Sequence, residues 1–236
     1  MTARLSVHRL CKRFGTGRDA PWVLQDVNFS IQPGEIVGLA GESGSGKSTL
    51  ARCVCGLLAR DSGDVILNGE AMPLHYRAAD FRRQAPQLQM IFQDPLSSLN
   101  PRLTLEESLT EPLRLHTTLD RRARRTRAAE WLQRMGLQHH DLARYPHSFS
   151  GGQLQRLGIA RALINSPGLL VCDEPVSALD VSVQAQIINL LLDLRQELGL
   201  SLLFIGHDLP MLRYLCDRVL FVREGTLHPD ELSAAP

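Results

Sequence analysis

The stretch that decides the fold reads Gly41-Glu42-Ser43-Gly44-Ser45-Gly46-Lys47-Ser48-Thr49. It matches the phosphate-binding pattern G-x-x-x-x-G-K-[ST], with Gly41, Gly46, Lys47 and Ser48 at the fixed places. The glycines let the backbone bend so that several N–H groups converge on phosphate oxygens. Lys47 would reach the β- and γ-phosphates, and the Ser48 hydroxyl would bind Mg²⁺. The stretch therefore predicts a nucleotide site.

The segments on either side of this loop have the character that such a site needs. The apolar run 36–40 is typical of a buried strand. Residues 50–54 continue as a helix whose N-terminus would point at the bound anion. A chance glycine-rich turn is the alternative, but it explains neither the strand nor the helix.

Length and charge limit what the chain can be. Its 236 residues suffice for one large α/β domain, or for a core with a smaller inserted subdomain. Lysine plus arginine number 26 and aspartate plus glutamate 25, so no overall basic field indicates a nucleic-acid partner. No apolar run approaches the ~18 residues of a membrane span, and residues 1–8 lack the apolar core of a signal peptide. If this chain serves a membrane, we expect it to do so through another chain.

Three groups of residues allow a functional interpretation and an ordinary one. The basic run 121–127 could hold an acidic partner, although the solvated face of a helix is the commoner explanation. His139, His140 and His147 lack a regular metal-ligand spacing and are interpreted as surface histidines. The cysteines are odd in number and irregularly spaced, and they are interpreted as reduced, mostly buried thiols of a cytosolic protein. They are Cys11, Cys53, Cys55, Cys172 and Cys216.

The remaining pattern predicts an α/β fold. Residues 5–10, 23–31 and 64–67 are expected as strands of an N-terminal antiparallel β subdomain, with a tight turn at Asn68-Gly69. A mostly parallel sheet with covering helices forms the P-loop NTPase core; its strands are expected at 36–40, 88–93, 169–173, 202–205 and 218–222, and its later helices at 183–198 and 209–216. An inserted α-helical subdomain is expected at 94–165, which leaves 1–93 and 166–236 as the nucleotide-binding core.

Polar residues follow the predicted strands where a phosphate-cleaving site needs them. Asp173 and Glu174 end the apolar run 169–172, and α/β sheets hold ligands at the carboxyl ends of strands. Asp173 can organise Mg²⁺ through water, and Glu174 is placed to polarise an attacking water. Gln93 could complete the metal shell, and His207 could hydrogen-bond the γ-phosphate. Singly these residues are equally explained as surface or loop polarity, but the phosphate loop in the same chain favours a site.

A second glycine-rich helix start stands at Ser150-Gly151-Gly152-Gln153. Two glycines in a first helical turn are unfavourable, since each costs about 1 kcal/mol against alanine. Close approach of the backbone to a ligand would justify them, and a helix N-terminus attracts anions. The plain alternative is a helix capped by Ser150.

Together these segments resemble the ATP-binding subunit of an ABC transporter, and the resemblance covers 1–236 as one ABC-type ATP-binding domain. It makes 41–49 the Walker A motif, Gln93 the Q-loop residue, 149–153 the signature motif, 169–174 the Walker B motif with Glu174 as catalytic base, 177–180 the D-loop, and His207 the switch histidine. Phe14 is similar to the aromatic residue that stacks on adenine, with Trp22 as a weaker candidate and core packing as the alternative for Phe14.

The resemblance implies ATP and Mg²⁺ as the bound groups. Nucleotide contacts would come from the whole loop, including Glu42, Ser43, Gly44, Ser45 and Thr49, and from Ser150, Gly151, Gly152, Gln153 and Asp180; Ser48, Gln93 and Asp173 would hold the metal. It also implies that two such chains dimerise head to tail, with each ATP between the Walker A loop of one chain and the signature motif of the other.

Two longer stretches, 91–102 and 173–184, resemble the dipeptide, oligopeptide and nickel importer ATPases of bacteria. Two departures matter: Gly206 stands where Thr or Ser usually precedes the histidine, and the chain ends at Pro236 without a cysteine-bearing tail, which raises nickel or a metal chelate as cargo. The implied partners are integral membrane permease subunits, a second ATP-binding subunit and an extracytoplasmic solute-binding protein, with no nucleic acid. The implied place is peripheral, at the cytoplasmic face of the inner membrane.

Two other functions stay open at this point. A soluble ABC ATPase of DNA repair or translation usually carries two ATPase cores or a long coiled coil, and this chain has one core and no heptad array. A P-loop kinase would need an acceptor site and has no use for the signature motif.

Overall fold

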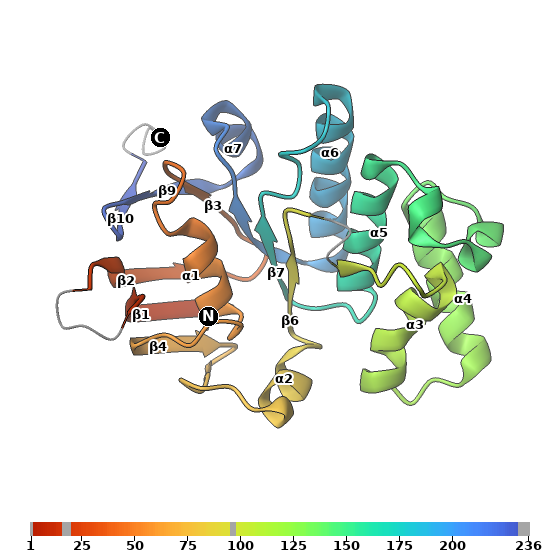
Figure 1. The fold of residues 1–236 in the computed structure, drawn as a ribbon, viewed down its shortest axis with the longest axis horizontal. Coiled ribbons are helices and arrows are strands. Elements are labelled where there is room, and N and C mark those ends of the chain that lie inside the picture. Colours follow the sequence, from red (N-terminus) through yellow and green to blue (C-terminus); the bar gives the residue numbers. More distant parts are fainter. Residues whose placement is uncertain (1, 16–19, 95–97, 231–236) are drawn as a thin grey trace.

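A computed structural model describes residues 2–15, 20–94 and 98–230 of the chain. Its strands form two sheets (Figure 1): a four-stranded sheet in the order β2-β1-β4-β5 and a six-stranded sheet in the order β10-β9-β3-β8-β7-β6. Residues 95–97 of the expected helical subdomain lie outside the described residues, as does the terminal Pro236.

The four-stranded sheet is antiparallel and comes from the N-terminal part of the chain, as predicted. Its strands are β1 (Leu5–Arg13), β2 (Trp22–Ile31), β4 (Ser62–Leu67) and β5 (Glu70–Ala71). Asn68 and Gly69 have φ angles of 52° and 82°, and a two-residue type I′ hairpin turn requires φ above zero at both positions. The chain therefore reverses within two residues, and β5 pairs directly with β4.

The six-stranded sheet is parallel except at one edge. β6 (Leu88–Ile91), β7 (Leu169–Asp173), β8 (Ser201–Ile205), β3 (Ile36–Ala40) and β9 (Arg218–Arg223) run parallel, while β10 (Thr226–Pro229) pairs antiparallel with β9. Every residue of β3, β7 and β8 is buried, as expected for strands covered on both faces. The prediction that β6 extends to Gln93 is wrong, because its pairing with β7 ends at Ile91 and Cys172.

Side chains of this sheet alternate between two hydrophobic clusters. On one face, Val37 and Leu203 pack with α1 (Lys47–Val54) and the antiparallel sheet. On the other face, Ile36 and Leu202 pack with α5 (Gly151–Leu163), α6 (Val181–Leu198) and α7 (Leu209–Leu215). One sheet thus carries the helix of the phosphate loop on one face and the helix that follows Ser150 on the other.

The helical part contains α3 (Leu105–His116), α4 (Arg121–Arg134), short 3-10 helices at His139–Ala143 and Pro146–Ser148, and α5. Figure 1 shows α3 and α4 beyond α5, at the end of the molecule away from the antiparallel sheet. Buried residues of α3 and α4 belong to the same cluster as those of α5 and α6. A short helix, α2 (Ala78–Gln84), was not predicted.

The basic run lies on the first two turns of α4. Arg121 and Arg122 are exposed, Arg125 pairs with Glu106 at 3.2 Å, and Arg127 Nε donates to the Ile164 carbonyl oxygen at 2.9 Å. The run therefore serves partly to join α4 to its neighbours. As predicted, the five cysteines are free thiols and most are buried.

Candidate functional site

The phosphate loop joins the end of β3 to the start of α1. Its glycines Gly41, Gly44 and Gly46 have φ angles of 149°, 81° and 107°, which other residues rarely adopt. A Cβ on Gly41 would come within 2.6 Å of the Val222 carbonyl oxygen, and one on Gly46 within 2.9 Å of the Val23 carbonyl oxygen. Glycine is therefore required at both ends of the loop, and the fold itself sets the bend.

Lys47 reaches back across this loop from the first turn of α1. Its side chain is only 6% exposed, and Nζ donates to the carbonyl oxygens of Gly41 and Glu42, each at 2.8 Å. The N-cap Gly46 supplies no side-chain cap, so N–H groups of the first turn stay available to an anion. Ser45 Oγ is buried and has no hydrogen-bond partner among the described residues. These open donors fit a polyphosphate.

Ser48 and Asp173 meet at the carboxyl end of β7. Ser48 Oγ donates to Asp173 Oδ1 at 2.8 Å, and Asp173 is 4% exposed. Burial raises the pKa of the Asp173 carboxyl, while the Ser48 hydrogen bond and the charge of Arg52 act in the opposite direction. A hydroxyl and a carboxylate side by side are hard oxygen ligands. The pair therefore fits Mg²⁺.

Glu174 follows in left-handed backbone, with φ of 49°. This conformation costs a residue other than glycine about 1–3 kcal/mol, and it brings Glu174 Oε2 within 3.6 Å of His207 Nδ1. Ser177 Oγ donates to the Glu174 carbonyl oxygen at 3.1 Å and accepts from Gln93 Nε2 at 3.3 Å. The structure thus joins Gln93, Glu174 and His207, and Ser177 is the bridge that sequence reasoning missed. Its position three residues after Glu174, the spacing of a tight turn, was the available signal.

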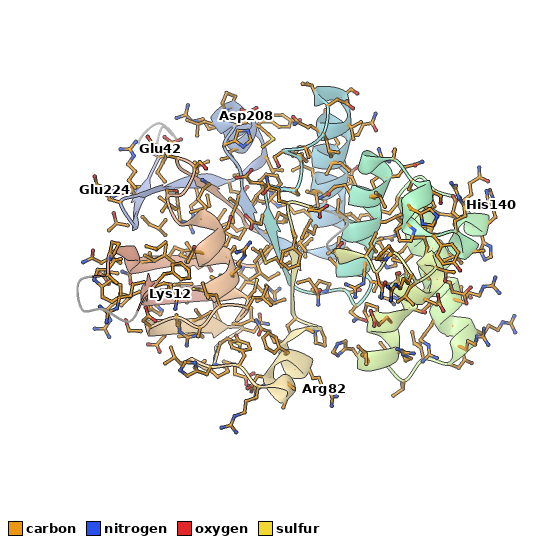
Figure 2. All side chains as sticks on the ribbon, in the orientation of Figure 1. Lys12, Glu42, Arg82, His140, Asp208 and Glu224 are labelled. Atoms are coloured by element: carbon orange, nitrogen blue, oxygen red, sulfur yellow. The ribbon has the colours of Figure 1, made fainter. Side chains whose placement is uncertain are left out.

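An open pocket of about 870 Å³ borders the phosphate loop and His207. It is lined by residues 40–45, His207, Leu209 and 221–224, and Figure 2 shows Glu42 and Glu224 near one another at this edge of the molecule. Gly206, the departure from the expected Thr or Ser, is buried beside it and does not use left-handed backbone. A Cβ there would lie 3.3 Å from Met211 Cε, the flexible end of a side chain. Gly206 therefore leaves the local turn unstrained.

The second glycine-rich segment begins α5. Ser150 is its N-cap: Ser150 Oγ accepts from the Gln153 N–H at 3.4 Å, and Gln153 Oε1 accepts from the Ser150 N–H at 3.0 Å. A Cβ on Gly152 would lie 2.7 Å from Val183 Cγ1 of α6, whereas one on Gly151 would meet only Leu179 Cδ2 at 3.8 Å. Gly152 therefore has a packing role on α6, and the contact of both glycines with a ligand stays a prediction.

The remaining predicted nucleotide contacts lie elsewhere in the fold. Asp180 is the N-cap of α6 and accepts from the Val183 N–H at 3.0 Å and from Ser182 Oγ at 2.7 Å. Phe14 is 54% exposed, with Lys12 Nζ 5.6 Å from its ring centroid, and Trp22 is 41% exposed. Exposure excludes core packing as the explanation of Phe14, so its ring is available for stacking. Thr49 lies in the first turn of α1, and Ser43 lies in the loop.

Residues 24–177 match the protein family described as ABC transporter. The chain belongs to the ABC transporter family. Among curated relatives, a putative peptide import ATP-binding protein of Brucella ovis is 46% identical over 226 residues, which are 96% of this chain and 71% of that protein. The oligopeptide transport ATP-binding protein OppF of Salmonella typhimurium is 50% identical over 200 residues, which are 84% of this chain and 60% of that protein.

Solved ABC structures have the same fold. The dimeric ATP-binding cassette MJ0796, in a post-hydrolysis state bound to ADP and Pi, is 29% identical with a TM-score of 0.86, over 96% of this chain and 97% of that one. The cbiO1 protein of Clostridium perfringens, part of the ABC transporter complex cbiONQ, is 27% identical with a TM-score of 0.84, over 97% and 88% of the two chains. The family and the α/β fold predicted from the sequence are confirmed, and the chain is an ABC-type ATPase.

The same comparisons bear on the alternatives. The ABC relatives reported above carry the names of peptide and oligopeptide transport, and neither name refers to DNA repair or translation. In the part of the chain that the structure describes, no helix is long and apolar enough to cross a membrane.

Proposed function

We propose that this chain is the ATP-hydrolysing subunit of a bacterial importer, that separate permease subunits cross the membrane, and that its cargo is peptides. The observation that carries the proposal is the joined set Ser48–Asp173 and Gln93–Ser177–Glu174–His207 beside the phosphate loop, in a chain about half identical to peptide importer subunits. The names of these relatives favour peptides over nickel or a metal chelate.

The geometry supports a division of roles within the site. Lys47 and the N–H groups of the phosphate loop bind the β- and γ-phosphates, and Phe14 stacks on the adenine of ATP. Ser48, Asp173 and Gln93 would hold Mg²⁺, which would neutralise the negative charge of the phosphates. Glu174 accepts a proton from the attacking water. His207, 3.6 Å from the Glu174 carboxylate, orients that carboxylate and donates to the γ-phosphate.

A complete site requires a second cassette, identical or different. We place Ser150, Gly151, Gly152 and Gln153 of one chain over the ATP held by the loop of the other, because these residues present a helix N-terminus to an anion. Asp180 lies at the start of α6, against which this segment packs through Val183. ATP binding would close the two chains and hydrolysis would open them.

The permease is proposed to dock in a groove between the two parts of the chain. This groove, of about 380 Å³, is lined by residues of β6, α2 and α5, among them Phe81, Met90, Gly158 and Ala162, and by Phe92, which follows β6. The groove lies between the core (1–93 and 166–236) and the helical subdomain (94–165). A permease segment bound there would therefore be displaced when these two parts move relative to one another. The chain would then be a peripheral protein of the cytoplasmic membrane face, and a solute-binding protein outside the membrane would deliver the peptide.

Co-purification with native companions tests this proposal. The chain is extracted from gently solubilised membranes, and its companions are identified. Membrane-spanning chains with an ATP-binding partner are expected, and Glu174→Gln should keep ATP binding while lowering turnover of the complex by at least ~10²-fold. Glu197→Gln on the exposed face of α6 is the matched control and should leave turnover unchanged. A soluble or ribosome-bound fraction without membrane chains would instead support the repair or translation function.

A further inference from the structure

We infer that Arg144 is a positioning residue for the segment that begins α5, the segment proposed above to bind the nucleotide of a second cassette. The inference rests on that proposed function. Arg144 touches neither the phosphate loop nor the network around Glu174. It acts instead on Ser148 and Phe149, the two residues immediately before Ser150.

Three contacts fix the guanidinium of Arg144. Nη1 donates to Asp141 Oδ1 at 2.8 Å, and Nη2 donates to the Ser148 carbonyl oxygen at 2.8 Å. Its Cζ lies 4.3 Å from the centroid of the Phe149 ring. The guanidinium thus binds Ser148 and the Asp141 carboxylate through two N–H groups, and its flat face lies against the Phe149 ring.

The other side of Arg144 is anchored to rigid elements. The Asp141 side chain is 7% exposed, and its Oδ2 accepts from the Gln138 N–H at 2.9 Å. The Arg144 carbonyl oxygen accepts from the Leu105 N–H, the first residue of α3, at 3.0 Å. The backbone of Arg144 therefore contacts the start of α3, and its guanidinium connects the 3-10 helix at 139–143 with the residues before α5.

Arginine is the residue type that this arrangement needs. A guanidinium presents several N–H groups at fixed angles and a flat face for a ring, whereas an ammonium is a point charge without such a face. Phe149 is only 8% exposed, so its position is set jointly by the buried cluster and by Arg144. Loss of the guanidinium would leave the Ser148 carbonyl free to rotate and would shift the Ser150 cap with it.

A small shift here matters because the N–H groups of the first turn must meet a phosphate held by another chain. Displacement of a binding group by about 1 Å can lower a rate by about 10²-fold. We expect the effect on kcat rather than on KM for ATP, because ATP is first held by the phosphate loop of the opposite cassette.

The test compares Arg144→Gln and Arg144→Lys with Arg134→Gln. Arg134 is the matched control, since it also contacts one carboxylate and one ring, Glu197 at 3.2 Å and Trp131 at 5.4 Å, but lies outside this segment. Hydrogen exchange of amides 150–153 is measured in the full chain, and kcat and KM are measured in the complex with its companions. Both Arg144 variants should exchange about ten-fold faster there, with amides 41–48 unchanged, and should lose about 10- to 100-fold in kcat.

An exchange rate or a kcat within two-fold of the unsubstituted protein for Arg144→Lys would overturn the inference, even if Arg144→Gln fails to fold. Equal effects of Arg134→Gln would overturn it as well, because they would indicate general loosening. Failure of the proposed function gives a different result: Glu174→Gln would then keep full hydrolysis, or no membrane companion would co-purify, while the exchange measurement would still decide the role of Arg144.

Discussion

Replacement of Gly152 by alanine tests the packing of α5 on α6. The added Cβ would lie 2.7 Å from Val183 Cγ1, well inside the ~3.5–4.0 Å of an ordinary carbon–carbon contact. Overpacking by one methyl group costs about 1–3 kcal/mol, and removal of a helical glycine returns about 1 kcal/mol. We therefore expect a free energy of unfolding lower by about 0–2 kcal/mol for Gly152→Ala.

Val183→Ala isolates the contact, because it removes the methyl group that clashes. The double variant should be more stable than the sum of the single changes by about 1–3 kcal/mol, the size of the clash. Gly151→Ala is the matched control, since its Cβ would meet only Leu179 Cδ2 at 3.8 Å. It should be neutral or more stable by up to about 1 kcal/mol.

Urea unfolding followed by tryptophan fluorescence gives these free energies, and the chain carries two tryptophans, one of them buried in α4 as Trp131. An unchanged m value, which is the slope of the unfolding free energy against urea concentration, would show in each variant that only the stability has changed. A coupling energy below about 0.5 kcal/mol, within the limit for independent sites, would refute the packing explanation of Gly152. Equal effects of the two glycine substitutions would refute it too.

Other expectations follow from single contacts. Burial opposes ionisation of Asp141, but hydrogen bonds from the Gln138 N–H and the Arg144 guanidinium hold its pKa below the usual range; Asp141→Asn should therefore lower the melting temperature at neutral pH, with the difference shrinking as pH falls through that low pKa. Phe14→Ala should weaken ATP binding measured by calorimetry about ten-fold, within the ~1–3 kcal/mol of a base–aromatic stack. If Trp22→Ala weakens ATP binding by this amount and Phe14→Ala does not, the assignment of Phe14 as the stacking residue is wrong. Ser48→Ala removes the donor to the buried Asp173 and should lower unfolding free energy by about 1–3 kcal/mol without Mg²⁺; unchanged stability in urea would argue against that bond.

Most of the sheet could be predicted because its signals are local. Runs such as 36–40 and 169–172 are apolar throughout, since both faces of those strands are covered. The Asn68-Gly69 pair encodes its turn in two residues, and Gly199 ends α6 in left-handed backbone with φ of 61°. In each case the cause lies within a few residues of its effect.

The elements that were missed depend on distant partners or lack a hydrophobic period. β10 contains His228 and Pro229, and it is a strand only because β9 lies beside it. α2 has no apolar period; its first turn is held by Asp80, whose carboxylate accepts from the Arg77 N–H at 2.9 Å. β6 is shorter than its sequence suggests, since the neighbouring strand decides where pairing ends. For β10 and β6 the cause lies in another segment, whereas the cap of α2 is local but lacks the hydrophobic period that would mark a helix.

The candidate site divides in the same way. The residue types and their order identified the phosphate loop, the two carboxylates and the histidine. The bond from Gln93 to Ser177 and the packing of Gly152 on Val183 join residues that only the fold brings together. The contacts of Arg144 are local, but the sequence pattern does not reveal them.

The left-handed backbone of Glu174 has a consequence for laboratory evolution. With φ of 49°, this position favours glycine or asparagine over glutamate by part of the ~1–3 kcal/mol of strain. A screen that rewards heat tolerance alone would therefore enrich replacements that discard the carboxylate, and the sturdiest clones would be inert. Selection for a more durable form of this cassette has to score turnover in every round.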